Sequence, residues 1–246
     1  MKRLSVLLDD IAFIRSALND DHFDPVRFAI LSENSGANGI VFTFSGNDNG
    51  IRERDLRLAK EMLGSFFNLR IPMKESAVKM ALSLIPDMVT FVDVHANEPR
   101  RTFTVDPVEH QQEIQQILPD LQANNISVSL LIKPELDTLK AMSKLAIDYV
   151  EIDTSEYTRA HDINDEIVAL DKIKSAALAV SKWGMGVNCS GNISYQDIAG
   201  LAQTPNLEDI TLGTHYINRA LQVGIDRAVS EAIQLINYRE IAIVKF

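Results

Sequence analysis

Only one cysteine, Cys189, occurs among the 246 residues, so the chain cannot form an internal disulfide and fits a reducing compartment. No apolar run approaches the ~20 residues that a membrane span needs. The apolar start is interrupted by Asp9 and Asp10, which argues against a signal peptide. The 24 Lys and Arg are outnumbered by 34 Asp and Glu, giving a net charge of -10, whereas nucleic-acid binding needs a concentrated basic face. We therefore predict a cytoplasmic protein without nucleic-acid or membrane partners.

Glycine is missing from the first predicted turn, Leu8-Asp9-Asp10, where a dinucleotide-binding fold carries its glycine-rich loop. The chain instead shows a regular alternation of short apolar runs and longer helical patterns, and Asp24-Pro25 is typical of a helix start. Strands are predicted at residues 4–8, 39–44, 67–71, 88–94, 126–132, 149–153, 185–189 and 209–212. Helices are predicted at residues 25–34, 53–63, 75–84, 107–124, 135–145, 163–183, 195–203 and 217–236, with a kink or break at Pro119.

Such alternation implies parallel strands joined by right-handed crossovers. The sequence therefore predicts one α/β domain over residues 1–246, a parallel eight-stranded (β/α)8 TIM barrel. An open doubly wound sheet is the alternative, although it usually has fewer strands.

Polar residues stand where the predicted strands end, which is the edge that carries the working site in TIM barrels. They are Asp9, Asp10, Arg70, Asp93, His95, Glu151, Asp153, Asn188, Thr214 and His215. One interpretation is a pocket in which Arg70 holds an anion, and the other is an inert buried network in which Arg70 pairs with Glu151 or Asp9. Clustered carboxylates suit hard cations, but no ligand-spacing motif is present, so no metal is predicted.

Two short segments after the last two strands are candidates for phosphate binding. Ser190-Gly191-Asn192 and Gly213-Thr214-His215 offer backbone N–H groups and small side chains where TIM barrels often bind phosphate, although both are also compatible with simple tight turns. Arg100 and Arg101, in the long segment 95–106, either close over an anionic ligand or form a solvated charge pair. Cys189 lies inside a strand and is interpreted as a buried apolar residue rather than a nucleophile.

Several segments together resemble the pyridoxine 5'-phosphate synthase family. They are residues 6–15 (VLLDDIAFIR), 24–26 (DPV), 36–40 (GANGI), 126–130 (ISVSL), 150–154 (VEIDT), 187–188 (VN), 212–213 (LG) and 218–220 (NRA), in the family's order and spacing. The resemblance covers essentially the whole chain and implies a TIM barrel. It also implies closure of the pyridoxine ring from 1-deoxy-xylulose 5-phosphate and an aminoacetone phosphate, no metal or organic cofactor, and a homo-oligomer, usually an octamer.

The chain departs from this family at most positions that the resemblance marks as catalytic. A family histidine and arginine at the end of strand two correspond to Thr43 and Ser45, and a glutamate at the end of strand three corresponds to Arg70. The glycine-histidine-glycine after strand seven corresponds to residues 190–192, and the histidine after strand eight to Thr214, with His215 one position later. In the first strand segment, Leu7 and Asp10 replace an asparagine and a histidine, while Asp9, Arg15 and Glu151 are retained.

Ring closure needs groups that exchange protons near the working pH, and threonine, serine, glycine and arginine do not. We therefore predict a diverged barrel that binds a phosphorylated small molecule or inorganic phosphate and has lost or altered its catalysis. The alternatives are a non-catalytic barrel kept for assembly and a retained synthase activity. Candidate catalytic residues are Asp9, Arg70, Glu151 and His215, and the phosphate candidates are Ser190, Gly191, Asn192, Gly213 and Thr214. Further pocket candidates are Asp10, Arg15, Thr43, Ser45, Asp153 and Asn188.

Overall fold

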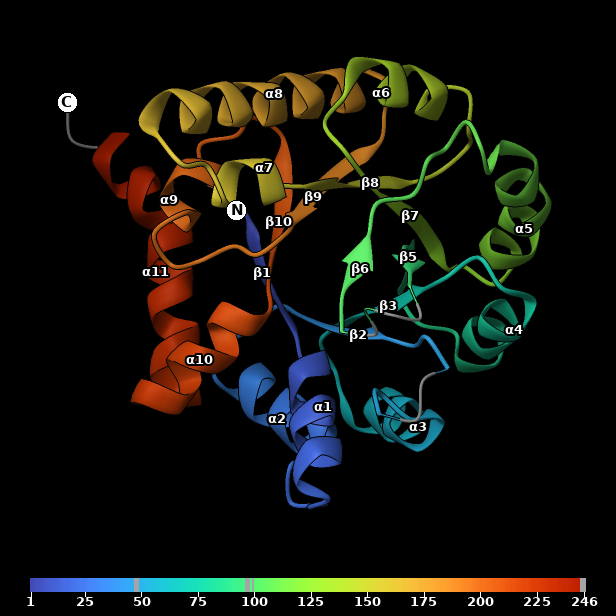
Figure 1. The fold of residues 1–246 in the computed structure, drawn as a ribbon, viewed down its shortest axis with the longest axis vertical. Helices are drawn as coiled ribbons and strands as arrows, with labels where there is room; N and C mark the ends of the chain where they lie inside the picture. Colours follow the sequence, from blue (N-terminus) through green and yellow to red (C-terminus); the bar gives the residue numbers. More distant parts are fainter. Residues whose placement is uncertain (47–48, 96–97, 99, 244–246) are drawn as a thin grey trace.

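Eight parallel strands close into a barrel in the computed structural model, which describes residues 1–46, 49–95, 98 and 100–243 (Figure 1). The barrel strands are β1 (Arg3–Leu7), β2 (Gly39–Thr43), β3 (Phe66–Ile71), β4 (Met88–Phe91), β7 (Ser127–Ile132), β8 (Tyr149–Asp153), β9 (Gly186–Ser190) and β10 (Leu207–Leu212). Their order around the barrel is β1-β10-β9-β8-β7-β4-β3-β2, with β2 closing on β1. The predicted (β/α)8 TIM barrel is confirmed.

The helices form a ring outside the strands (Figure 1). They are α1 (Asp9–Leu18), α2 (Pro25–Asn34), α3 (Glu53–Met62), α4 (Glu75–Leu84), α5 (Gln111–Ala123), α6 (Leu136–Met142), α7 (Ser155–Thr158), α8 (Ile163–Lys182), α9 (Ile198–Leu201), α10 (Thr214–Val223) and α11 (Ile225–Ile243). As predicted, Asp24 caps α2 by accepting a hydrogen bond from the Val26 N–H at 3.0 Å. Apolar side chains between the strands and the helix ring form the core. Within the described residues, no helix combines the length and the apolar character needed to cross a membrane.

The first helix was not predicted, because its acidic start resembles a turn. In the structure, Asp9 and Asp10 form the first turn of α1, where negative charge favours a helix, and Asn19 ends the helix in the left-handed conformation, with φ 50°. The helix buries Ile11 and Ala12 against the barrel. The two aspartates therefore begin a helix rather than occupy an open loop.

The segment after the fourth strand also differs from the prediction. The strand expected over residues 88–94 ends at Phe91, and β5 (Asp93–Val94) pairs antiparallel with β6 (Thr102–Phe103). Part of the predicted 95–106 segment, residues 96, 97 and 99, lies outside the described residues. The next helix, α5, starts at Gln111 rather than at residue 107 and continues through Pro119, so the helix does not break there.

Candidate functional site

A cavity of about 340 Å³ lies where the carboxyl ends of the barrel strands meet the following loops. Its wall includes the ends of β3, β8, β9 and β10 and the β6 strand of the hairpin. The lining residues with polar side chains or exposed backbone include Arg70, Arg101, Thr102, Thr104, Lys133, Asp153, Ser155, Arg159, Ser190, Gly191, Asn192, Thr211, Gly213, Thr214 and His215. The five predicted phosphate residues and the candidate His215 are thus brought together on one wall.

Arg70, which lines this cavity, forms a buried ion pair with Glu151. The Arg70 Nη2 group donates to Glu151 Oε1, and the Ser190 hydroxyl donates to the same oxygen. Arg70 and Glu151 are 2% and 1% exposed. Of the two sequence interpretations of Arg70, the structure shows the pairing with Glu151. Arg70 Nε and Glu151 Oε2 have no hydrogen-bond partner within the described residues, so this pair is only partly satisfied.

The segment after β9 is held in a conformation that only glycine accommodates well. Gly191 has a φ of +123°, and a Cβ built there would lie 2.3 Å from Asp153 Oδ1 and 2.8 Å from the Thr154 backbone nitrogen. The Thr154 and Thr158 hydroxyls each donate to the Gly191 carbonyl at 3.0 Å. These contacts hold the turn against α7 and fix the backbone of Ser190 and Gly191 on the cavity wall.

The segment after β10 begins a helix rather than a loop. Gly213 is the N-cap of α10, and Thr214 and His215 form its first turn. The first N–H groups of a helix have no intrahelical acceptor, and the helix dipole makes this end favourable for an anion. The Gly213 carbonyl accepts the Tyr216 N–H at 2.8 Å, which closes this turn. The wall therefore carries backbone donors of the kind that bind phosphate.

Besides Arg70, three cationic side chains line the same cavity, and only Arg101 among these three was a candidate from the sequence. Lys133 comes directly after β7 and Arg159 directly after α7, while Arg101 precedes β6 and donates to Glu98 Oε2 at 2.8 Å. Its neighbour Arg100 lies over the Phe13 ring at 5.4 Å. Lys133 could have been found from the sequence, because it lies next to the end of a predicted strand. Arg159 lacked that signal because α7 separates it from β8.

Asp9, Thr43 and Ser45 line a second, much smaller cavity of about 10 Å³ beside the β2 end. Asp9 Oδ1 accepts the Thr43 backbone N–H at 2.8 Å. Burial raises the pKa of Asp9 to about 6, against the lowering effect of its hydrogen bonds with Thr43 and of the Arg70 charge. A carboxyl with this pKa can exchange protons near neutral pH, but the space next to it holds no more than a water-sized molecule. Arg101 lies on the walls of both cavities.

The Asp153 side chain is directly on the wall of the main cavity. Its Oδ1 accepts hydrogen bonds from the Ser155 hydroxyl at 2.7 Å and from the Ser155 N–H at 3.2 Å. Burial raises the pKa of Asp153, and these hydrogen bonds oppose part of the rise. Glu151, two residues earlier on β8, does not line this cavity and pairs with Arg70 instead.

Three other predicted pocket residues do not line either of these two cavities. Arg15 points between α1 and α3, where it makes two hydrogen bonds to Asp55, at 2.8 and 3.0 Å. Asn188 lies inside the barrel, with its Nδ2 3.9 Å from Met88 Sδ. Asp10 lies in the first turn of α1. Arg15, which matches the family residue type, therefore belongs to a buried ion pair and does not contact the mouth of the barrel.

The cation site considered from the strand-end carboxylates does not form within the described part of the chain. Asp93 and His95 pair with each other at 3.3 Å, and both are about half exposed. Across the described residues, no group of three or more histidine, cysteine, aspartate or glutamate side chains is arranged to hold a metal ion.

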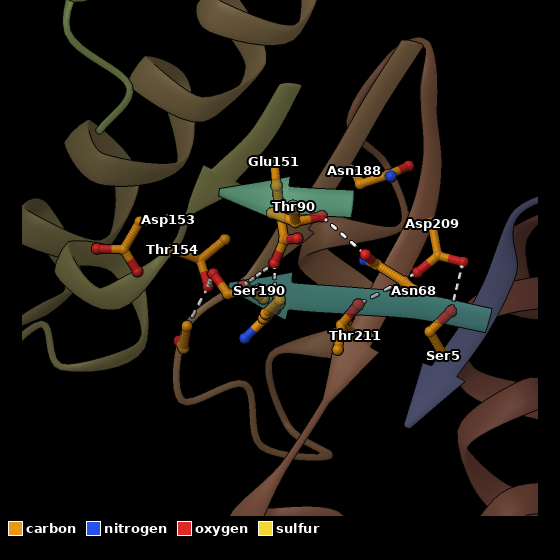
Figure 2. A network of polar contacts seen from close by, with 12 residues as sticks. Ser5, Asn68, Thr90, Glu151, Asp153, Thr154, Asn188, Ser190, Asp209 and Thr211 are labelled. Atoms are coloured by element: carbon orange, nitrogen blue, oxygen red, sulfur yellow. Dashed lines mark hydrogen bonds and ion pairs between the residues drawn. The ribbon is translucent and has the colours of Figure 1, made fainter. Parts of the chain in front are cut away.

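Polar side chains on several barrel strands form a network of hydrogen bonds, which Figure 2 shows. Asp209 accepts hydrogen bonds from the Ser5 hydroxyl at 2.8 Å and the Thr211 hydroxyl at 3.3 Å. The Thr90 hydroxyl donates to Asn68 at 2.9 Å. Burial raises the pKa of Asp209 to about 6, and the hydrogen bond from Ser5 opposes the rise. This network was not predicted from the sequence, because its strands are distant in sequence.

Sequence comparison relates nearly the whole chain to one family. The family model described as pyridoxal phosphate biosynthesis protein PdxJ matches residues 4–238. The chain is 34% identical over 238 residues to the pyridoxine 5'-phosphate synthase of Geotalea daltonii, which covers 97% of this chain and 100% of that protein. The pyridoxine 5'-phosphate synthase of Geobacter sulfurreducens is 33% identical with the same coverage.

Solved structures of more distant proteins share the fold. A mutant tryptophan synthase alpha-subunit from Pyrococcus furiosus superposes with a TM-score of 0.63 at 14% identity, covering 96% of each chain. The N-(5'-phosphoribosyl)anthranilate isomerase from the same organism gives a TM-score of 0.60 at 14% identity, covering 97% of this chain and 100% of the other. At such identities the likeness concerns the barrel architecture alone.

Proposed function

Since this chain belongs to the PdxJ family, that of the pyridoxal phosphate biosynthesis protein, we propose that it is a pyridoxine 5'-phosphate synthase-like barrel that binds a phosphorylated small molecule and whose ring-closing chemistry is lost or altered. The observation that carries the binding proposal is the common wall formed by residues 190–192 and by Gly213 and Thr214. This wall combines small side chains with the N-terminus of α10, and it faces a cavity large enough for a small phosphate ester.

The chemical part of the proposal rests on what occupies the proton-transfer positions. The resemblance expects a glutamate where Arg70 stands, and Arg70 is committed to the buried pair with Glu151. Thr43 and Ser45 replace the expected histidine and arginine and line only the small cavity. A base must reach the proton that it removes with a suitable pKa. Neither Arg70 nor the paired Glu151 is free for that role.

Altered rather than lost chemistry would use the proton carriers that remain on the main wall, Asp153 and His215. The pKa of Asp153 is raised by burial, toward the range in which a carboxyl acts as an acid or base at neutral pH. His215 is the second residue of α10, after Thr214. Both therefore face the space where the ligand is proposed to bind.

Titration calorimetry with inorganic phosphate and with 1-deoxy-xylulose 5-phosphate tests the binding proposal. We expect saturable heat with both compounds. Gly191→Ala should weaken phosphate binding by about tenfold or more, because a Cβ would displace the backbone that forms the wall. Gly184→Ala is the matched control: Gly184 also has a positive φ, +82°, but nothing lies within 4 Å of its Cβ position. Absence of heat with either compound would favour the non-catalytic assembly role.

Product analysis tests the chemical proposal. The purified protein, given 1-deoxy-xylulose 5-phosphate and the aminoacetone phosphate, should form little or no pyridoxine 5'-phosphate, with the Geobacter sulfurreducens relative as the positive control. Turnover at the relative's rate, or full rescue of a pyridoxine auxotroph, would establish retained activity instead. A homo-oligomer, expected from the resemblance, is part of the proposal, and sedimentation velocity measures it directly.

A further inference from the structure

The wall of the main cavity carries an excess of positive charge in a strongly acidic protein. The chain has a net charge of -10, yet Arg70, Arg101, Lys133 and Arg159 line the cavity and Asp153 is the one carboxylate among the described lining residues. Arg70 is neutralised by Glu151 and Arg101 is paired with Glu98. Lys133 and Arg159 account for the remaining excess.

These two side chains are available for a ligand. Both are exposed, and neither forms an ion pair within the described part of the chain. By contrast, some exposed cations elsewhere on the surface are paired, for example Lys172 with Glu156 at 2.9 Å. Arg159 shares the cavity wall with Asp153, and its positive charge opposes part of the rise that burial causes in the pKa of Asp153.

Lys133 and Arg159 lie apart from the proposed phosphate wall. Lys133 follows β7, and Arg159 ends α7, which follows β8, whereas the phosphate wall follows β9 and β10. The barrel order places β7 next to β8, β8 next to β9 and β9 next to β10. Neighbouring strands are about 4.8 Å apart, so one to two strand steps separate the two groups by roughly 5–10 Å. Anionic groups at the two ends of a three- or four-carbon compound span this distance.

We propose that Lys133 and Arg159 form a second anion-binding subsite, so that the cavity takes a small molecule carrying two anionic groups, with its phosphate on the β9/β10 wall. This inference rests on the proposed phosphate binding and adds the class of ligand. The lysine supplies a point charge and the arginine a planar pair of donors, a combination that suits a carboxylate or a second phosphate.

A pair of ligands that differ in one charged group tests the inference. Glycerol 3-phosphate and 3-phosphoglycerate share a phosphate and a three-carbon chain, but only the second has a carboxylate. By calorimetry at low ionic strength, we expect 3-phosphoglycerate to bind about fivefold to tenfold more tightly, since each partly exposed charge pair contributes up to about 1 kcal/mol. Propane-1,3-diol bisphosphate, measured in parallel, shows whether the second subsite binds a phosphate more tightly than a carboxylate.

The double variant Lys133→Met with Arg159→Met should abolish this preference, so that it binds 3-phosphoglycerate and glycerol 3-phosphate within about twofold of each other. The matched control removes two exposed positive charges elsewhere, Arg27→Met on α2 with Lys182→Met on α8, and should retain the preference. Equal binding of the two ligands by the wild type, or an unchanged preference in the double variant, would overturn the subsite while leaving phosphate binding intact. Absence of inorganic phosphate binding would overturn the proposed function and this inference with it.

Discussion

Replacing Arg70 by methionine should destabilise the protein far more than removing any exposed ion pair. Methionine replaces the aliphatic part of the arginine side chain but not its guanidinium group, so the main loss is the charge partner of Glu151, which is 1% exposed. Removing one member of a buried pair leaves an uncompensated charge and costs about 3–5 kcal/mol. For a chain of this length, each kcal/mol lowers the melting temperature by about 2–4 °C, so a decrease of roughly 10 °C is expected.

Urea denaturation at pH 7.5 measures this loss, and two further variants define its origin. Arg57→Met removes an arginine–glutamate pair with Glu53 on the α3 surface, where both side chains are about half exposed, and should cost no more than about 0.5 kcal/mol. The double variant Arg70→Met with Glu151→Gln keeps an acceptor for the Ser190 hydroxyl without a buried charge, and it should recover most of the lost stability.

The pH dependence provides a separate check on the same reasoning. In Arg70→Met, the unpaired carboxyl can be neutralised by taking up a proton, so its penalty is full at high pH and decreases as the pH falls. The difference in unfolding free energy from the wild type should therefore shrink between pH 8 and pH 5. A loss below about 1 kcal/mol at pH 7.5, or a double variant that is less stable than Arg70→Met, would refute the account of a buried charge pair.

Three further predictions concern other buried groups. Burial raises the pKa of Asp209 from 3.8 to about 6, so the folded protein binds this proton more tightly than the unfolded chain does. The contribution of Asp209 to the free energy of unfolding is therefore greatest below about pH 4. It declines by up to about 3 kcal/mol as the pH rises through 6. Asp209→Asn should therefore gain stability relative to the wild type between pH 4.5 and pH 8 in urea titrations, and a constant difference would contradict the assignment. Asp55→Ala removes the partner of buried Arg15 and should lower the unfolding free energy by about 3–5 kcal/mol in the same assay, whereas a loss near that of Arg57→Met would mean that the pair contributes little. Cys189 is fully buried, which raises the pKa of its thiol well above the usual value, so a thiol reagent should react only on unfolding, and rapid labelling of the native protein would show that the site opens.

The barrel itself was determined by the sequence, because strand and helix patterns are local. Apolar runs such as 39–44 and 126–132, each followed by an amphipathic stretch, specify buried parallel strands and their crossover helices without knowledge of any long-range contact. The same logic placed Ser190, Gly191 and Thr214 at one mouth, since every parallel strand ends on the same face of a closed barrel. The local patterns failed where polar and apolar signals conflict, as in the acidic first turn of α1.

Which charges neutralise each other was decided by the tertiary structure alone. Arg70 and Glu151 are 81 residues apart and lie on β3 and β8, which are separated in the barrel by β4 and β7, so their contact exists only because the sheet closes across its own interior. Arg15 meets Asp55 because α1 packs near α3, and Lys133 and Arg159 share a wall because β7 and β8 are neighbours. A sequence specifies such side chains one at a time, but Coulomb energy and desolvation depend on distances and burial that the closed fold sets.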